Sequence, residues 1–141
     1  IALVALVNFA LTGLPLIGGE VISLERIAGW IFSPIALCMG IPWSEAQLGG
    51  SLLGVKTILN EFVAYVKLAG INANDLSEKS RLIMLYALCG FANLSSVGIL
   101  LSGISAMVPE RKDDLISVSG KALVGATLAS CFTGLVVGII Y

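Results

Sequence analysis

Two short polar clusters interrupt long apolar stretches of this 141-residue sequence. The first is Asn60 and Glu61, in the stretch GVKTILNEFVAY, which also holds Lys56. The second is NLSS at 93–96, which follows Phe91 in the stretch CGFANLSS. Their side chains supply a carboxylate, amides and hydroxyls, so the two clusters can accept hydrogen bonds from a ligand and donate them to it.

These groups suit a neutral ligand that has several hydroxyl groups and a flat part. The carboxylate of Glu61 can accept two hydrogen bonds from a vicinal diol, Asn93 can donate and accept, and Phe91 offers an apolar face. Ser95 and Ser96 add hydroxyls. A phosphorylated or carboxylated ligand would meet the charge of Glu61 unfavourably.

Each of these residues also has a structural interpretation, and the sequence leaves both interpretations open. Glu61 can pair with a lysine, either Lys56 or one outside this sequence, and Asn93 with its neighbouring serines can join helices by hydrogen bonds. Phe91 can be a packing residue, and Lys56 fits a structural partner better than a ligand contact. No nucleophile, base and orienting partner occur together, so the sequence does not indicate an enzyme.

The elements that must position the clusters are predicted to be membrane helices. The chain is 57% hydrophobic and 12% charged, whereas soluble domains have about 25% charged residues. The net charge of −1 gives no basic surface for nucleic acid. The composition therefore predicts an all-α integral membrane protein. The sequence starts at Ile1 rather than Met, and we expect it to be part of a longer protein.

Two apolar segments precede the first polar cluster. Residues 1–19 carry no charge, and they have about the length of a membrane-spanning helix, roughly 20 residues. Residues 20–41 are predicted to start a helix with Ser23 as the N-cap. Prolines interrupt this region and tryptophans flank it: Trp30, Pro34, Pro42 and Trp43. This pattern is typical of a helix at the membrane interface, and a short, kinked spanning helix is the alternative.

Residues 42–68 hold the first cluster and favour a re-entrant hairpin. A single helix of this length would reach about 40 Å and would place Lys56 and Glu61 in lipid. Each such charge is expected to cost about 2.5–3.5 kcal/mol at the centre of a membrane helix. A hairpin whose tip is buried in protein avoids that cost. We expect Asn60 to cap the second arm, which places Glu61 in its first turn, where the helix dipole favours a carboxylate.

Residues 79–109 favour a helix that is broken in the membrane. Their uncharged part, 82–109, would be about 42 Å long against a hydrocarbon core of about 30 Å, and the second polar cluster lies near its middle. Residues 115–141 are expected to form a last spanning helix after the charged turn ERKDD. Lysines and arginines number four on one side and three on the other, so they do not set the orientation. Helices interrupted near the bilayer midplane typically mark the binding site of a transporter.

The stretch GVKTILNEFVAY resembles the signature of the concentrative nucleoside transporter family. That signature is a small residue, one position, Lys, three positions, then Asn-Glu-Phe-Val-Ala and an aromatic residue or Met. Every position of it is met between Gly54 and Tyr65. CGFANLSS resembles the broken-helix motif of the same family, and PWSEA and VPERK are similar to other family segments. The resemblance covers essentially the whole chain.

The resemblance implies the fold of the second half of an inverted-repeat transporter, that is, the C-terminal third of a longer chain. It assigns residues 1–19 to a scaffold transmembrane helix at a trimer interface and residues 20–41 to an interfacial helix. Residues 42–68 become the re-entrant hairpin and residues 79–109 the broken transmembrane helix. Residues 115–141 become the final transmembrane helix, with the charged turn before it in the cytoplasm.

Carried over residue by residue, the resemblance implies a nucleoside site. Glu61 resembles the carboxylate that binds the ribose hydroxyls. Asn93 and Ser96 resemble the ribose-binding pair of the broken helix, and Phe91 resembles the aromatic residue that packs against the nucleoside. Three further candidates complete the set: Asn60, Ser95 and Lys56. Of these, Asn60 is expected to be structural at the hairpin tip.

The expected function is symport of nucleosides with Na⁺ or H⁺ by alternating access, with the ribose bound by this part of the chain. The expected setting is a bacterial inner membrane that the protein crosses several times, as a homotrimer surrounded by lipid. No cofactor and no metal ligand are expected in this segment, because the family's ion site and base-reading residues lie upstream. The coupling ion and the choice of purine or pyrimidine therefore stay open. The alternatives are a proton-driven carrier of another neutral hydroxylated solute and a membrane scaffold subunit that transports nothing.

Overall fold

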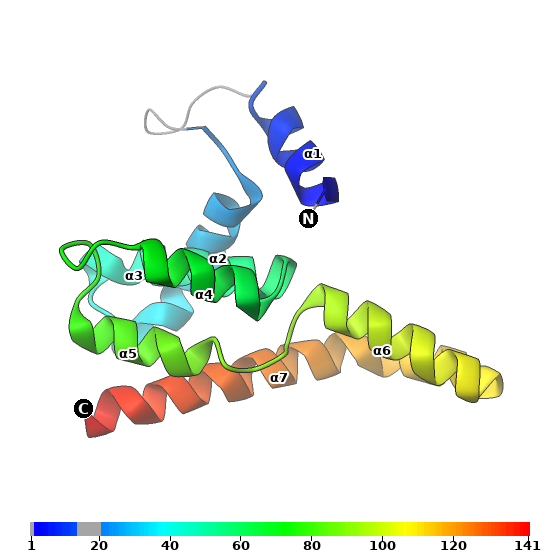
Figure 1. Ribbon diagram of the computed structural model, residues 1–141. Helices are drawn as coiled ribbons and strands as arrows, with labels where there is room; N and C mark the ends of the chain where they lie inside the picture. Colours follow the sequence, from blue (N-terminus) through cyan, green and yellow to red (C-terminus); the bar gives the residue numbers. More distant parts are fainter. Residues whose placement is uncertain (1, 14–20) are drawn as a thin grey trace.

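The computed structural model of the chain describes residues 2–13 and 21–141, and every regular element in these ranges is helical (Figure 1). The elements in chain order are α1 (Ala2–Leu11), α2 (Leu24–Cys38), α3 (Trp43–Ile58), α4 (Glu61–Gly70), α5 (Glu78–Ala87), α6 (Leu94–Met107), the 3₁₀ turn η1 (Pro109–Arg111) and α7 (Lys112–Ile140). The prediction of an all-α chain is confirmed for the described residues. Of the predicted scaffold helix at 1–19, the structure describes α1 and the turn after it, and residues 1 and 14–19 lie outside the described ranges.

One helix in the described residues is long and apolar enough to cross a bilayer by itself. The 3₁₀ turn and α7 together run from Pro109 to Ile140, and α7 with its 29 residues is about 44 Å long. Helices α2 and α3 pass the same test of length and composition only as a pair, and they are bent by 119° at the connection between them. Helix α6 is apolar but shorter, with 14 residues.

Helices α2 and α3 pack closely because small residues line their contact. Ser23 caps α2 by accepting a hydrogen bond from the backbone N–H of Arg26 at 3.2 Å, as the sequence predicts. The chain then turns back at Gly40, which has a φ of +93°. At the crossing, a Cβ atom on Gly54 would overlap with the Cβ of Ala28. Only glycine permits this approach of the two backbones, so the small residue at the start of the GVKTILNEFVAY stretch is needed for the contact between α2 and α3.

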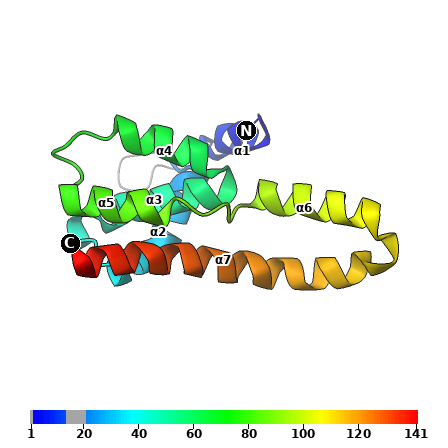
Figure 2. The same cartoon turned by 60° about the horizontal axis from the view of Figure 1, so that its bottom comes forward.

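Helices α5 and α6 follow each other along α7. In Figures 1 and 2, α7 runs beside α6 and then beside α5, and the C-terminus ends near the start of α5. The segment between Ala87 and Leu94 is not helical, so the chain is interrupted where the sequence predicts a break in 79–109, and the position of this break within a membrane stays a prediction. The buried apolar core lies among α2, α3, α4, α5 and α7, with fully buried side chains such as Leu53, Ile83 and Met84. In α6 no residue is buried.

We predict that Gly54→Ala destabilises the protein by about 1–3 kcal/mol, the usual range for overpacking a filled contact. The added methyl group would meet the Cβ of Ala28, so α2 and α3 must move apart. The measurement is the melting temperature of the purified full-length protein in detergent. Gly70→Ala is the matched control, because a Cβ there meets nothing within 4 Å. Equal melting temperatures for the two variants would contradict the close crossing of α2 and α3.

Candidate functional site

The first helix interruption lies between α3 and α4. Helix α3 ends at Ile58, and the backbone N–H of Leu59 bonds back to the carbonyl of Val55 at 2.8 Å. Asn60 then caps α4, and its Oδ1 accepts a hydrogen bond from the backbone N–H of Val63 at 2.9 Å. The cap places Glu61 at the first position of α4. Both the predicted cap and the position of Glu61 are confirmed.

The second interruption lies between α5 and α6. Helix α5 ends at Ala87, and Asn93 caps α6. The Oδ1 of Asn93 accepts a hydrogen bond from the backbone N–H of Ser96 at 2.7 Å. The N-terminal backbone of α6 is therefore bound by the same side chain that the sequence singles out as a candidate ligand contact.

The two interruptions meet at one hydrogen bond. The Nδ2 of Asn93 donates to Oε2 of Glu61 at 2.9 Å, so the N-terminal ends of α4 and α6 share a carboxylate and an amide. Asn93 is buried and Glu61 is half-buried. The positive ends of two helix dipoles favour the negative charge at this place. A carboxylate has about four lone-pair sites, so Glu61 keeps room to accept hydrogen bonds from a ligand while it holds Asn93.

Lys56, in the last turn of α3, binds a backbone carbonyl rather than the carboxylate of Glu61. Its side chain is fully buried, and its Nζ donates to the carbonyl oxygen of Ala87 at 2.9 Å. In the part of the chain that the structure describes, the side-chain ion pairs are Glu25–Lys67 and Arg111–Asp114. The structure therefore does not contain the alternative pairing of Glu61 with Lys56.

The remaining candidate residues lie on the segments that flank the Glu61–Asn93 contact. Phe91 is exposed in the segment between α5 and α6, with 75% of its surface accessible. Ser96 is half-buried in the first turn of α6, and Ser95 is exposed. Asn60 and Ser95 line a cavity of about 530 Å³ that α1 closes on another side. The structure thus brings Glu61 and Asn93 together and leaves the ring of Phe91 accessible.

Several residues that hold these elements in place were not identified from the sequence. Two arginine nitrogens of Arg81 donate to the carbonyls of Leu68 and Ile71 at 2.8 Å each, at the end of α4. Glu45 near the start of α3 accepts from the hydroxyl of Ser77 at 2.9 Å, at the start of α5. The predicted helix ends are a signal for such contacts, because the backbone groups at a helix end need hydrogen-bond partners from elsewhere in the protein.

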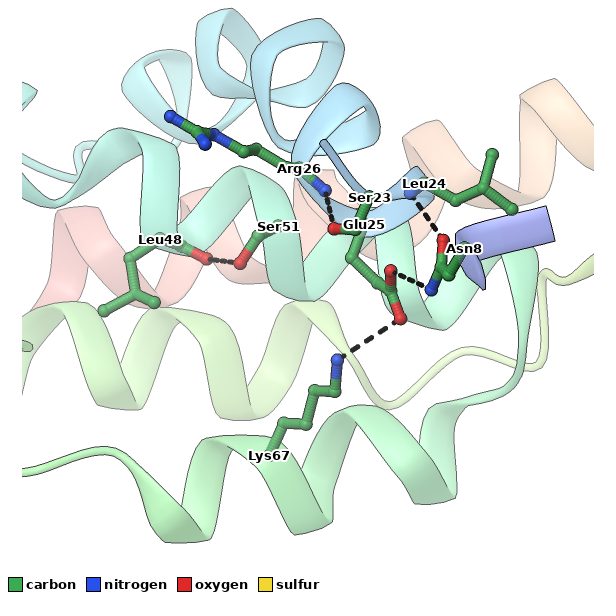
Figure 3. A network of polar contacts seen from close by, with 8 residues as sticks. All are labelled: Asn8, Ser23, Leu24, Glu25, Arg26, Leu48, Ser51 and Lys67. Carbon is green, nitrogen blue, oxygen red and sulfur yellow. Dashed lines mark hydrogen bonds and ion pairs between the residues drawn. The ribbon is translucent and has the colours of Figure 1, made fainter. Parts of the chain in front are cut away.

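A separate network of polar contacts connects α1, α2 and α4 (Figure 3). Asn8 on α1 donates from Nδ2 to Glu25 Oε2 at 2.9 Å, and its Oδ1 accepts from the backbone N–H of Leu24 at 2.9 Å. The Nζ of Lys67 on α4 lies 3.5 Å from Oε1 of Glu25. These contacts hold the C-terminal part of α4, the helix whose N-terminal end carries Glu61.

Comparison with known proteins places the whole of this arrangement in one family. Residues 1–138 match the family described as "Na+ dependent nucleoside transporter C-terminus". The chain is 42% identical over 139 residues to the uncharacterized transporter YutK of Bacillus subtilis, covering 98% of this chain and 34% of that protein. It is 40% identical over 124 residues to the nucleoside permease NupC of Helicobacter pylori, covering 85% of this chain and 30% of the permease.

A solved structure is similar along almost the whole chain. The structure of CNTnw in an inward-facing substrate-bound state superposes with a TM-score of 0.83 at 40% identity, covering 97% of this chain and 33% of that one. The chain therefore spans about a third of the length of the curated relatives and of the solved structure that it matches.

We predict that Asn93→Asp destabilises the protein and that Glu61→Gln in the same molecule restores its stability. The new aspartate would still cap α6, but it would place a second carboxylate against Glu61 in partly buried surroundings. In the double variant, the new amide at position 61 can donate to the carboxylate at position 93. We expect a coupling free energy of about 0.5–3 kcal/mol, the range for residues in direct contact.

The measurement is a double-mutant cycle of thermal unfolding on the full-length protein in nanodiscs. Additive effects of the two substitutions would show that the hydrogen bond between Glu61 and Asn93 does not contribute to stability.

Proposed function

The chain belongs to the Na⁺-dependent nucleoside transporter family, whose C-terminal part its residues 1–138 match, and we propose that it forms the ribose-binding part of a cation-coupled nucleoside symporter. The observation that carries the proposal is the hydrogen bond of 2.9 Å between Glu61 and Asn93. It joins the ends of two interrupted helices, and such ends typically form the binding site of a secondary transporter.

The chemistry of the site suits a ribose ring. The vicinal hydroxyls of ribose can both donate to the carboxylate of Glu61, which keeps acceptor sites beside the bond from Asn93. In this proposal the second amide hydrogen of Asn93 and the hydroxyl of Ser96 bind the ribose oxygens. The exposed ring of Phe91 packs against the flat part of the nucleoside. Asn60 and Ser95 serve mainly to shape the hairpin tip and the start of α6.

The same proposal gives each segment a place in a membrane. Residues 1–19 belong to a scaffold helix in a homotrimer, and residues 20–41 form an interfacial helix. Residues 42–68 form a re-entrant hairpin in this proposal, which the hydrogen bond between Glu61 near its tip and Asn93 supports. Residues 79–109 cross the membrane as a broken helix, and residues 115–141 as a continuous one. Alternating access then exposes the site first to one side and then to the other of a bacterial inner membrane.

The proposed coupling ion is Na⁺, because the description of the matched family names Na⁺ dependence. Its site would lie in the part of the full-length protein that precedes this segment. Coupling to H⁺ is the competing proposal. A carrier of another neutral hydroxylated solute and a scaffold subunit without transport are the other outcomes that the experiments below can give.

We predict that Glu61→Gln lowers the affinity for a nucleoside about ten-fold to a hundred-fold, because hydrogen bonds to a charged group contribute roughly 1.5–3 kcal/mol. Gln can still accept the bond from Asn93, so the fold should survive. The measurement is equilibrium binding of uridine and of adenosine to the purified full-length protein. Glu110→Gln, an exposed carboxylate in the 3₁₀ turn, is the control that should bind like the wild type. Unchanged affinity in Glu61→Gln would remove this residue from the site.

We predict that vesicles containing the full-length protein accumulate labelled uridine or adenosine when a Na⁺ gradient is imposed. The gradient drives uptake because ion and nucleoside are carried together. A proton gradient without Na⁺ is the comparison, and uptake driven by it alone would assign the coupling to H⁺. No uptake of either nucleoside by folded protein under both gradients would favour another solute or the scaffold role.

A further inference from the structure

The last turn of α5 has an unusual set of hydrogen-bond donors. The last four carbonyls of an α-helix have no partner within the helix, and in α5 these are the carbonyls of residues 84–87. Two of them are bound by the backbone that follows. The N–H of Leu88 bonds to the carbonyl of Met84 at 2.9 Å, and the N–H of Cys89 bonds to that of Tyr86 at 3.2 Å.

The other two carbonyls are bound by side chains of the hairpin. The hydroxyl of Tyr65 on α4 donates to the carbonyl of Leu85 at 2.8 Å. The Nζ of Lys56 on α3 donates to the carbonyl of Ala87 at 2.9 Å. Both arms of the hairpin therefore reach the same turn of α5, one from each side of the tip at Asn60.

These two bonds satisfy the carbonyls that a longer α5 would bind with its own backbone. In a continuous α-helix, the N–H of Cys89 would bond to Leu85 and the N–H of Phe91 would bond to Ala87, because each N–H bonds four residues back. Tyr65 and Lys56 take the places of these two backbone donors. The side-chain bonds thus give these carbonyls partners without continuation of the helix, which lowers the cost of ending α5 before Asn93.

The surroundings of Lys56 support a positional role. Its charge lies near the C-terminal ends of both α3 and α5, where the helix dipoles favour a cation. A Cβ atom on Gly90 would overlap with Oγ of Ser130 on α7 and would lie 3.5 Å from the Nζ of Lys56. Helix α7 therefore packs directly on the interrupted segment, and the lysine lies beside this contact with no exposed surface.

We propose that Lys56 and Tyr65 are positioning residues that end α5 at Ala87 and thereby set where α6 begins, so that Asn93 meets Glu61. The role in substrate binding rests on the proposed nucleoside site, whereas the role in ending α5 does not. Within the GVKTILNEFVAY stretch, the outer residues Lys56 and Tyr65 end one half of the broken helix. The inner residue Glu61 contacts the start of the other half.

The test uses the full-length protein with Tyr65→Phe and Lys56→Met, which remove the donors and keep most of the side-chain volume. The matched controls are Tyr86→Phe and Lys79→Met, at exposed positions of α5. The first readout is the ratio of affinities for uridine and 3′-deoxyuridine, and for adenosine and 3′-deoxyadenosine. We expect the preference for the hydroxylated nucleoside to fall roughly ten-fold in both variants, which is the effect of losing about one hydrogen bond between a charged group and the 3′-hydroxyl. In the controls the preference should stay unchanged.

This ratio separates positioning from a general loss of stability. A variant that is merely less stable has less folded protein, but its folded fraction keeps the wild-type preference for the 3′-hydroxyl. An unchanged ratio in folded Tyr65→Phe would overturn the proposal. If Lys56→Met does not fold, Tyr65→Phe decides by itself, because it removes one oxygen atom only.

The second readout does not depend on any nucleoside. Hydrogen exchange should slow at the backbone amide of Cys89 in Tyr65→Phe and at that of Phe91 in Lys56→Met, because each variant releases the carbonyl to which that N–H would bond in a longer helix. Exchange that is unchanged or faster than in the wild type would overturn the role of Tyr65 and Lys56 in ending α5. If the wild type binds neither nucleoside pair, the proposed function fails, and the exchange measurement still decides whether the two side chains end α5.

Discussion

The structure depends on one constraint, which is that every backbone group at a helix interruption needs a hydrogen-bond partner from the protein. In an apolar environment an unpaired N–H or carbonyl costs several kcal/mol, and this chain interrupts its apolar helices twice. At the N-terminal ends the partners are the caps Asn60 and Asn93. At the C-terminal end of α5 the partners are Lys56 and Tyr65. These four side chains therefore bind backbone groups, whatever ligand the site binds.

The same constraint separates the charges of the hairpin. Lys56 and Glu61 are close in the chain, but they belong to different helices, one on each side of the hairpin tip. The lysine binds at the C-terminal end of α5, and the carboxylate binds at the N-terminal end of α6. Helix dipoles favour each charge where it lies. Because Lys56 donates to the carbonyl of Ala87, the oxygens of Glu61 bind Asn93 and keep lone pairs for the hydroxyls of a ligand.

Packing by small residues makes these contacts reachable. Gly54 lets α3 lie directly against α2, and Gly90 lets the interrupted segment lie directly against α7. The hairpin is held at its outer end as well, where Arg81 binds the end of α4 and Glu25 binds Lys67. The site is thus supported from both ends of the hairpin, which restricts the movement of Glu61 relative to the broken helix. Helix α6 contributes the cap at its start but buries no residue in the described part of the chain.

The sequence by itself determined the local features of this protein. The all-helical class, the cap at Asn60, the first-turn position of Glu61 and the interruption before Asn93 all follow from composition, capping residues and the length of uncharged runs, which act within a few positions. Only the tertiary structure decided the partners. Lys56 could equally have paired with Glu61, and nothing near Tyr65 in the chain indicates a bond to a carbonyl 20 residues away. Such partners depend on how the helices pack, because a free carbonyl at the end of one helix accepts whichever donor the neighbouring helix brings within reach.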